Sequence, residues 1–287
     1  MTLDQRIEKD LAERRNGNSI TAAKQLAPLA KAGHGFQFST QGLPTYFTGD
    51  RDAQTVFVQL NPGMDAEKAD AKWTEYTKEF NTSNLEAFIA DYKTRQQYFG
   101  LTDRLRYDKF DVRQAAFLYE WKDSGINFSK NINWLSREEK LNAKELVLMQ
   151  KLQLELIPFA SQRFELNKSQ SDLLIPYVET LLEEIFSKEE GRKYVIFGGV
   201  IFDSLFEQYN KEKYKGTFTT LLSMQSIKLE GLQKKVNYSV VGINYHGKKQ
   251  KALIAQTYPN QRLLSDYAIL QEYGRQCYEA FINTLLK

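Results

Sequence analysis

An apolar run, Thr55-Val56-Phe57-Val58-Gln59-Leu60, stops abruptly at Asn61-Pro62-Gly63. The run is rich in β-branched and apolar residues, which is typical of a strand buried on both faces of a parallel sheet. The Asn-Pro-Gly sequence then ends the strand in a tight loop. Open α/β sheets bind their ligands beyond the carboxyl ends of their strands. We therefore expect a candidate site directly after this strand.

Further strands and helices alternate along the rest of the chain. Strands are predicted over 152–157, 194–197, 236–245 and 252–256, and helices over 173–186, 201–209 and about 265–286. The last two strands read as a hairpin joined by the basic turn Lys248-Lys249-Gln250-Lys251. This alternation predicts an α/β fold, namely a three-layer α/β/α sandwich with a mostly parallel central sheet.

Two parts of the chain lie outside this sheet framework. Residues 1–35 read as N-terminal helices, over Leu3–Arg15 and Thr21–Lys31. Residues from about 66 to 140 read as a long helical insertion, in which Trp73, Tyr76, Phe80, Phe88 and Tyr92 recur at helical spacing. Basic residues later in this insertion alternate with aromatic ones, which fits an amphipathic helix or a surface that binds single strands. With no repeat or linker visible, we expect one domain over residues 1–287.

Composition limits the classes of function. The chain has 287 residues with 39 Lys or Arg and 36 Asp or Glu, and its net charge of +3 permits a DNA-binding groove without arguing for one. One cysteine, Cys277, excludes a disulfide framework, a Cys-rich zinc site and a four-thiolate iron–sulfur cluster within the chain. Of the two histidines, His246 reads as a solvated turn residue beside Gly247. No run approaches the roughly 20 apolar residues that span a bilayer, so we expect a cytoplasmic protein without a membrane partner.

Three predicted strands end in short loops that contain proline. These loops are Asn61-Pro62-Gly63, Pro158-Phe159-Ala160-Ser161 and Tyr258-Pro259-Asn260. The carboxyl ends of parallel strands meet at one edge of a sheet, so the three loops can converge on one pocket. The high aromatic content, 13%, then divides into residues that fill cores and two residues on these loops, Phe159 and Tyr258.

The ordered set of these segments resembles the uracil-DNA glycosylase superfamily. The matching segments are Val56–Gly63, Leu154–Phe159, Val195–Gly199 and Ala255–Asn260, which together cover the sheet framework and about half the chain. The first segment is similar to the Asn-Pro-Gly loop of the mismatch-specific uracil/thymine branch. The resemblance implies that Asn61 positions the attacking water, with Pro62 and Gly63 beside the substrate. It also implies a DNA partner, a nucleobase in the pocket, and no metal or cofactor.

The last loop departs from the family pattern. The family has His-Pro-Ser or Asn-Pro-Ser here, which grips the DNA backbone and stabilises the departing base. Tyr258 stands at the position of the histidine and Asn260 at that of the serine, with Pro259 between them. A tyrosine can donate a hydrogen bond to a developing oxyanion, but it is not cationic at neutral pH. This replacement weakens the prediction that the protein excises uracil.

The expected reaction is hydrolysis of the bond between a damaged or deaminated base and deoxyribose. The base must be flipped out of the duplex, a water must attack the sugar, and the leaving anion must be stabilised. Asparagine orients water but is a weak base, so Asp65 is a candidate carboxylate, although it also suits a helix cap. Glu155 lies within an apolar strand and either pairs with a basic residue or points into the pocket. Phe159 either stacks on a base or packs in the core.

Further residues are candidates for contact with the DNA backbone. Arg262 follows the last loop and suits a phosphate contact, while Leu263 is either an apolar wedge into the base stack or the first buried residue of the final helix. Lys248 and Lys249 either contact phosphates or form a solvated turn. The main alternative to a DNA glycosylase is a non-catalytic member of the same fold that binds nucleic acid or a nucleotide. A sugar-phosphate enzyme is a third hypothesis, but Gly198-Gly199 is too short for a glycine-rich phosphate loop.

Overall fold

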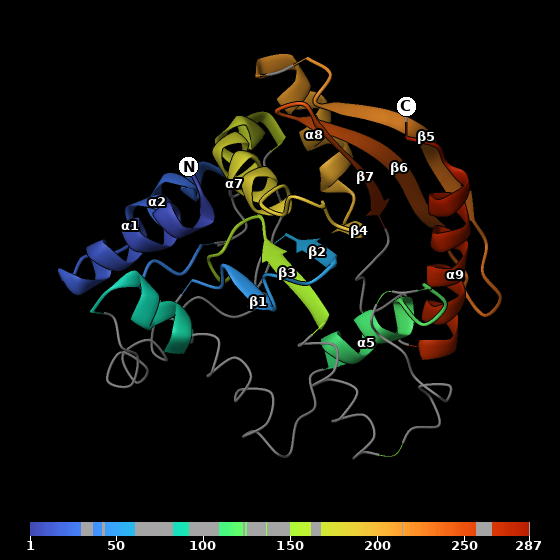
Figure 1. Ribbon diagram of the computed structural model, residues 1–287, viewed down its shortest axis with the longest axis horizontal. Helices are drawn as coiled ribbons and strands as arrows, with labels where there is room; N and C mark the ends of the chain where they lie inside the picture. Colours follow the sequence, from blue (N-terminus) through green and yellow to red (C-terminus); the bar gives the residue numbers. More distant parts are fainter. Residues whose placement is uncertain are drawn as a thin grey trace. The chain divides into compact units, whose positions relative to one another are not determined.

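A computed structural model describes residues 1–29, 37–41, 44–60, 83–91, 109–122, 124, 136, 150–161, 168–213, 215–256 and 266–286. Strands are β1 (Phe47–Gly49), β2 (Thr55–Gln59), β3 (Lys151–Glu155), β4 (Tyr194–Gly198), β5 (Phe218–Ile227), β6 (Val236–Tyr245) and β7 (Lys248–Ala255) (Figure 1). Helices are α1 (Leu3–Arg15), α2 (Thr21–Gln25), α5 (Lys109–Phe117), α7 (Ile175–Ile185), α8 (Ile201–Glu212) and α9 (Tyr267–Asn283), with 3₁₀ turns η1 (Ala27–Leu29) and η3 (Lys168–Leu174).

The strands form one seven-stranded sheet in the order β1-β3-β2-β4-β7-β6-β5. β4 pairs in parallel with both β2 and β7, whereas β6 pairs antiparallel with β7 and β5. The predicted α/β class is confirmed, and the sheet is mixed because its β7-β6-β5 part is antiparallel. In the part of the chain that the structure describes, no helix is long and apolar enough to cross a membrane.

The chain divides into two compact units. The first comprises Met1–Phe47, Leu60–Arg95 and Leu154–Glu184, and the second comprises Thr48–Gln59, Gln96–Gln153 and Ile185–Lys287. The prediction of a single domain stays a prediction. Most of the predicted insertion, including Trp73, Tyr76, Phe80 and Tyr92, lies outside the described residues.

The first unit contains a buried polar cluster on α1. That helix begins with a capping box in which Thr2 and Gln5 bond reciprocally. Further along, the Tyr46 hydroxyl donates to Oδ2 of Asp10 at 3.0 Å, and the Asp10 side chain is 1% exposed. Burial raises the pKa of Asp10 to about 6, against the opposing hydrogen bond from Tyr46 and the charge of Arg6. The Arg6 guanidinium in turn bonds Oγ1 of Thr180 at 3.0 and 3.2 Å.

The second unit packs helices on both faces of its strands. On one face α5 and α9 lie side by side (Figure 1) and cover Ile196 of β4. Nε1 of Trp121 donates to the carbonyl oxygen of Gly274 in α9 at 2.9 Å. A Cβ at Gly274 would lie 1.8 Å from the carbonyl oxygen of Phe117, so the two backbones approach too closely for any side chain. On the other face Phe197 packs against two rings of α8, at 4.9 and 5.0 Å between ring centroids.

The predicted elements of the second unit are largely confirmed, with two differences. β6 spans the predicted residues, and β2 and β4 each differ from the predicted strand by one residue at the carboxyl end. The predicted basic turn over residues 248–251 is wrong, because those residues begin β7 and the turn is His246-Gly247. Both turn residues have positive φ, 49° and 78°, as a two-residue hairpin turn requires, and His246 is exposed as predicted. β5 was not expected from the sequence.

Candidate functional site

The carboxyl ends of β2, β4 and β7 lie at one edge of the sheet. Residues Val58, Phe197 and Ile254 are aligned across the three strands, so Gln59, Gly198 and Ala255 follow in the next row. β4 lies between the other two strands. With neighbouring strands about 4.8 Å apart, the ends of β2 and β7 are roughly 10 Å from each other. This geometry places the end of β4 at the centre of a candidate site.

The Gln59 side chain covers the end of β4. A Cβ at Gly198 would lie 2.6 Å from Oε1 and 3.0 Å from Nε2 of Gln59, so the missing side chain makes room for the amide. Gln59 is 5% exposed, and its Nε2 has no hydrogen-bond partner among the described residues. A buried donor without an acceptor costs about 1–3 kcal/mol. Such a group is a candidate contact for a ligand atom that accepts a hydrogen bond.

Asp203 lies in the first turn of α8, beside the same edge. Its Oδ1 accepts a hydrogen bond from Oγ of Ser239 at 3.2 Å, and its Oδ2 accepts from Nε2 of Gln256. Burial raises the pKa of the Asp203 carboxyl, and the nearby charge of Glu207 adds to this, while the two hydrogen bonds oppose it. Asp203 is therefore a half-buried carboxyl that is more readily protonated than an exposed one.

Gln256 is fixed at the point where the chain leaves β7. Its backbone N–H donates to the carbonyl oxygen of Asn237 at 3.0 Å, and its side chain donates to Asp203. The N–H of Gly199 donates to the carbonyl oxygen of Ala255 at 3.1 Å. We call Gln59, Gly198, Asp203, Ser239 and Gln256 the strand-end cluster. None of these residues was predicted as a site residue, although Gln59 and Gln256 are polar residues two positions before two predicted loops.

Most of the predicted site residues lie outside the described part of the chain. They are Asn61, Pro62, Gly63, Asp65, Tyr258, Pro259, Asn260, Arg262 and Leu263. Their roles stay predictions. In the sequence, Asn61 follows Gln59 by two residues and Tyr258 follows Gln256 by two.

Glu155 and Phe159 are described, and both are buried. Glu155 ends β3 and is 7% exposed, and its N–H donates to the carbonyl oxygen of Tyr46 at 3.4 Å. Phe159 is 1% exposed and is among the largest fully buried side chains. The Phe159 ring is thus packed on all sides, as the interpretation of Phe159 as a core residue predicts. Contact of either residue with a base stays a prediction.

Lys248 and Lys249 lie at the opposite end of β7 from the strand-end cluster. Ala255 lies seven positions after Lys248, which corresponds to roughly 23 Å along a strand. Both side chains are exposed, and Nζ of Lys248 donates to the carbonyl oxygen of Phe186 at 3.4 Å. Any phosphate that they contact is thus far from a base bound at the carboxyl ends of the strands.

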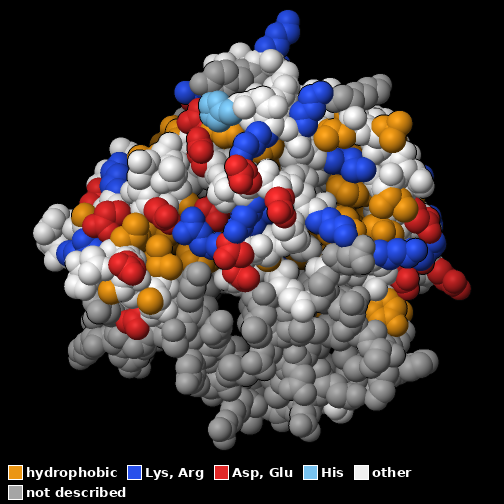
Figure 2. Space-filling model, in the orientation of Figure 1, with side chains coloured by type: hydrophobic (Ala, Val, Ile, Leu, Met, Phe, Trp, Pro, Cys, Tyr) orange, Lys and Arg blue, Asp and Glu red, His pale blue; other side chains and the backbone are white. Residues whose placement is uncertain are grey.

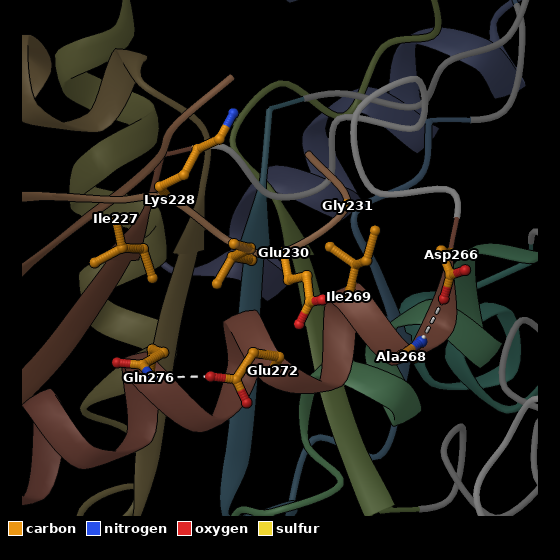
Figure 3. A pocket seen from close by; sticks show the side chains of 10 residues that line it. Ile227, Lys228, Glu230, Gly231, Asp266, Ala268, Ile269, Glu272 and Gln276 are labelled. Carbon is orange, nitrogen blue, oxygen red and sulfur yellow. Dashed lines mark hydrogen bonds between the residues drawn. The ribbon is translucent and has the colours of Figure 1, made fainter. Parts of the chain in front are cut away.

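A separate hollow of about 790 Å³ lies between the segment after β5 and α9 (Figure 3). Its polar lining includes Lys228, Glu230, Asp266 and Glu272. Asp266 caps α9 by accepting from the N–H of Ala268 at 2.7 Å, and hydrogen bonds from Arg275 lower the pKa of Glu272. Because three carboxylates and one lysine line this hollow, its charge repels a phosphate ligand.

Charges of both signs are interspersed on the face seen in Figure 2. Blue and red side chains alternate across its coloured part, so that part of the surface has no continuous basic stripe of the kind that follows a nucleic-acid backbone. Among the described residues no three His, Cys, Asp or Glu side chains are grouped so that they could hold a metal ion. The strand-end cluster thus offers hydrogen bonds and one half-buried carboxyl.

Comparison with known proteins found no matching family model, no matching curated protein and no matching solved structure. The resemblance to uracil-DNA glycosylases therefore rests on the motifs in the sequence.

Proposed function

We propose that this protein binds DNA beyond the carboxyl ends of β2, β4 and β7 and hydrolyses the N-glycosidic bond of a damaged or deaminated base. The observation that supports the proposal most is the alignment of Gln59, Gly198 and Ala255 at one edge. The motifs that resemble those of the glycosylases follow directly: Asn61 comes after β2 and Tyr258 after β7.

In this proposal the strand-end cluster contributes to recognition of the base. Nε2 of Gln59 is a buried donor that has no partner within the described part of the chain, so a carbonyl oxygen of a flipped base would satisfy it. Because Gly198 has no side chain, the Gln59 amide has room to lie at this position. Asp203 and Ser239 act at a distance from the base, because their hydrogen bonds hold Gln256 at the start of the loop that contains Tyr258.

The proposed chemistry divides between the two loops. Asn61 orients the water that attacks the sugar, and Asp65 is the candidate carboxylate for its proton. Tyr258 donates a hydrogen bond to the departing base as negative charge develops on it. Pro259 and Asn260 hold the loop against the substrate, while Arg262 contacts a phosphate and Leu263 fills the gap in the base stack.

Base release is the direct test. Oligonucleotides with uracil, a thymine mismatch or hypoxanthine are incubated with the wild-type protein, and cleavage at the abasic product is measured. Asn61→Ala and Tyr258→Ala are each expected to slow release at least tenfold. Asn244→Ala is the matched control, because Asn244 is an exposed residue of β6. No release from any substrate contradicts the enzymatic proposal.

A second candidate is a protein that binds nucleic acid or a nucleotide without cleaving it. The observation that favours it is Tyr258 at the position of the family histidine. DNA binding that weakens with salt, together with no base release, supports this candidate. Absence of binding at low salt contradicts both candidates.

The proposal includes a three-layer α/β/α architecture for the whole chain, with a mostly parallel sheet outside the β7-β6-β5 part. It also includes a cytoplasmic location, which agrees with a buried free thiol at Cys277. Cell fractionation tests the location.

A further inference from the structure

Two buried polar side chains lie one helical turn apart on α1, and each of them contacts a different neighbour. They are Arg6 and Asp10. The Arg6 guanidinium donates to Oγ1 of Thr180 and, at 3.1 Å, to the carbonyl oxygen of Pro176 in α7. Its Cζ also lies 4.0 Å from the centroid of the Tyr177 ring, in the same helix. These contacts join Arg6 to α7, and none of these hydrogen bonds goes to Asp10.

The Asp10 carboxyl is buried where α1 meets the segment before β1. Its Oδ2 accepts from the Tyr46 hydroxyl, whereas its Oδ1 has no hydrogen-bond partner among the described residues. A buried carboxylate is costly unless it is paired and hydrogen-bonded, and a neutral carboxyl needs less compensation because it has no charge. The surroundings of Asp10 therefore suit its neutral form better than its charged form.

The described groups that act on the charge of Asp10 come from α1, α7 and the segment before β1. They are Arg6, Lys9, Glu13, Tyr46 and Tyr177. Burial is the largest cause of the raised Asp10 pKa of about 6; Tyr46 and the two basic residues oppose it, and Glu13 adds to it. Burial also raises the pKa of Tyr177 to about 12, so that group stays neutral while Asp10 titrates. Among the described residues, α2 packs on α1 but adds no charge to this set.

α1 can open without breaking the pairing of the strands, because it contributes no strand to the sheet. Proteins open locally at free energies below that of global unfolding. In the open state Asp10 is in water and regains its ordinary pKa of 3.8, so its ionisation favours opening. Opening also exposes the apolar residues that α1 buries, namely Leu3, Ile7 and Leu11.

We propose that α1 is a pH-sensitive latch, which is closed on α7 and Tyr46 while Asp10 is neutral and loosens when Asp10 loses its proton. The closed state binds the proton more tightly than the open state does. Closure is therefore strongest in acid and weakens as the pH rises through the Asp10 pKa of about 6. From the pKa values of the two states, the equilibrium constant for opening should rise about tenfold between about pH 5 and pH 7.5. This inference is independent of the proposed function, because it concerns α1 and its neighbours alone.

Amide hydrogen exchange measured by NMR between about pH 5 and pH 7.5 tests the latch. Each rate is divided by the intrinsic rate of the same amide at that pH, which removes the ordinary pH dependence of exchange. In the wild type, protection of the α1 amides is expected to fall about tenfold over this range. In Asp10→Asn it is expected to be the same at every pH, because asparagine has a similar shape and does not ionise. Asp4→Asn is the matched control, since Asp4 is a half-buried carboxyl in the first turn of the same helix, and it should keep the wild-type profile.

A second variant tests which group sets the midpoint. The Tyr46 hydrogen bond favours the charged carboxyl, so Tyr46→Phe should raise the Asp10 pKa and move the loss of protection to higher pH. At each pH the α1 amides should also be less protected than those of α7, because α1 opens by itself.

Four results overturn the proposal. The first is protection of α1 that does not change with pH in the wild type, and the second is a pH dependence that Asp10→Asn retains. The third is an unshifted midpoint in Tyr46→Phe. The fourth is equal protection of α1 and α7, which would show that the two helices open only together.

Discussion

Replacement of Gly198 by alanine tests the packing of the strand-end cluster. The added Cβ would lie 2.6 Å from Oε1, 3.0 Å from Nε2 and 3.1 Å from Cδ of Gln59. Gln59 is 5% exposed, so its amide must move within a packed environment. Overpacking of this kind costs about 1–3 kcal/mol. At about 2 °C per kcal/mol for a protein of this size, the melting temperature should fall by about 2–6 °C.

A double-mutant cycle attributes the loss to Gln59. Thermal and urea unfolding are measured for Gly198→Ala, Gln59→Ala and the double variant. Because Gln59→Ala removes the atoms that the new Cβ contacts, Gly198→Ala should be much less destabilising in that background. Gly247→Ala is the control: a Cβ at Gly247 meets nothing within 4 Å, so its cost comes from the positive φ alone.

Two results would refute this reasoning. If Gly198→Ala changes the free energy of unfolding by less than about 0.5 kcal/mol, the contact between Gln59 and Gly198 is not tight. If the two substitutions are additive, the loss arises from another contact. Base release gives a separate readout, since displacement of the Gln59 amide should slow it if the proposed function holds.

Three further predictions concern the two units. The Asp10 pKa of about 6 exceeds its ordinary value of 3.8, so the native state binds the proton more tightly than the unfolded state does. The free energy of unfolding should therefore fall by about 2 kcal/mol as pH rises from about 4 to 7. Asp10→Asn should flatten this pH profile, as measured in urea titrations. Gly274→Ala forces a Cβ to within 1.8 Å of the Phe117 carbonyl oxygen and should cost over about 3 kcal/mol; a shift in melting temperature below about 5 °C would contradict the close approach. Trp121→Phe removes the indole N–H that donates to the Gly274 carbonyl oxygen within α9, and loss of this hydrogen bond should cost about 0.5–1.5 kcal/mol in chemical denaturation, whereas an unchanged midpoint would show that the bond contributes nothing.

The sequence predicted the strands whose burial is uniform. β2 and β4 are buried along their whole length, so an apolar run is their direct signature. β5 has mostly exposed or half-buried residues and two bulges, and its Thr, Ser and Gln residues give no regular alternation. The start of β7 was misread because Lys248 and Lys249 are polar residues at the exposed end of an otherwise buried strand.

The candidate site was only partly predictable. The ends of β2 and β7 follow from the apolar runs and the proline loops. The contact between Gln59 and Gly198 depends on the register of two strands whose residues are over a hundred positions apart, and no local pattern specifies that register. The bonds from Ser239 and Gln256 to Asp203 depend likewise on how α8 packs over the sheet.

The close approach of α5 and α9 has a consequence for how the chain folds. The bond from Trp121 to Gly274 joins residues 153 positions apart, so a long loop must close before the two helices meet. During synthesis the rings of Phe117 and Trp121 emerge well before their α9 partners, Tyr273 and Phe281. Until α9 leaves the ribosome, these rings lack its cover and are open to aggregation. Completion of the second unit thus waits for α9 to be translated.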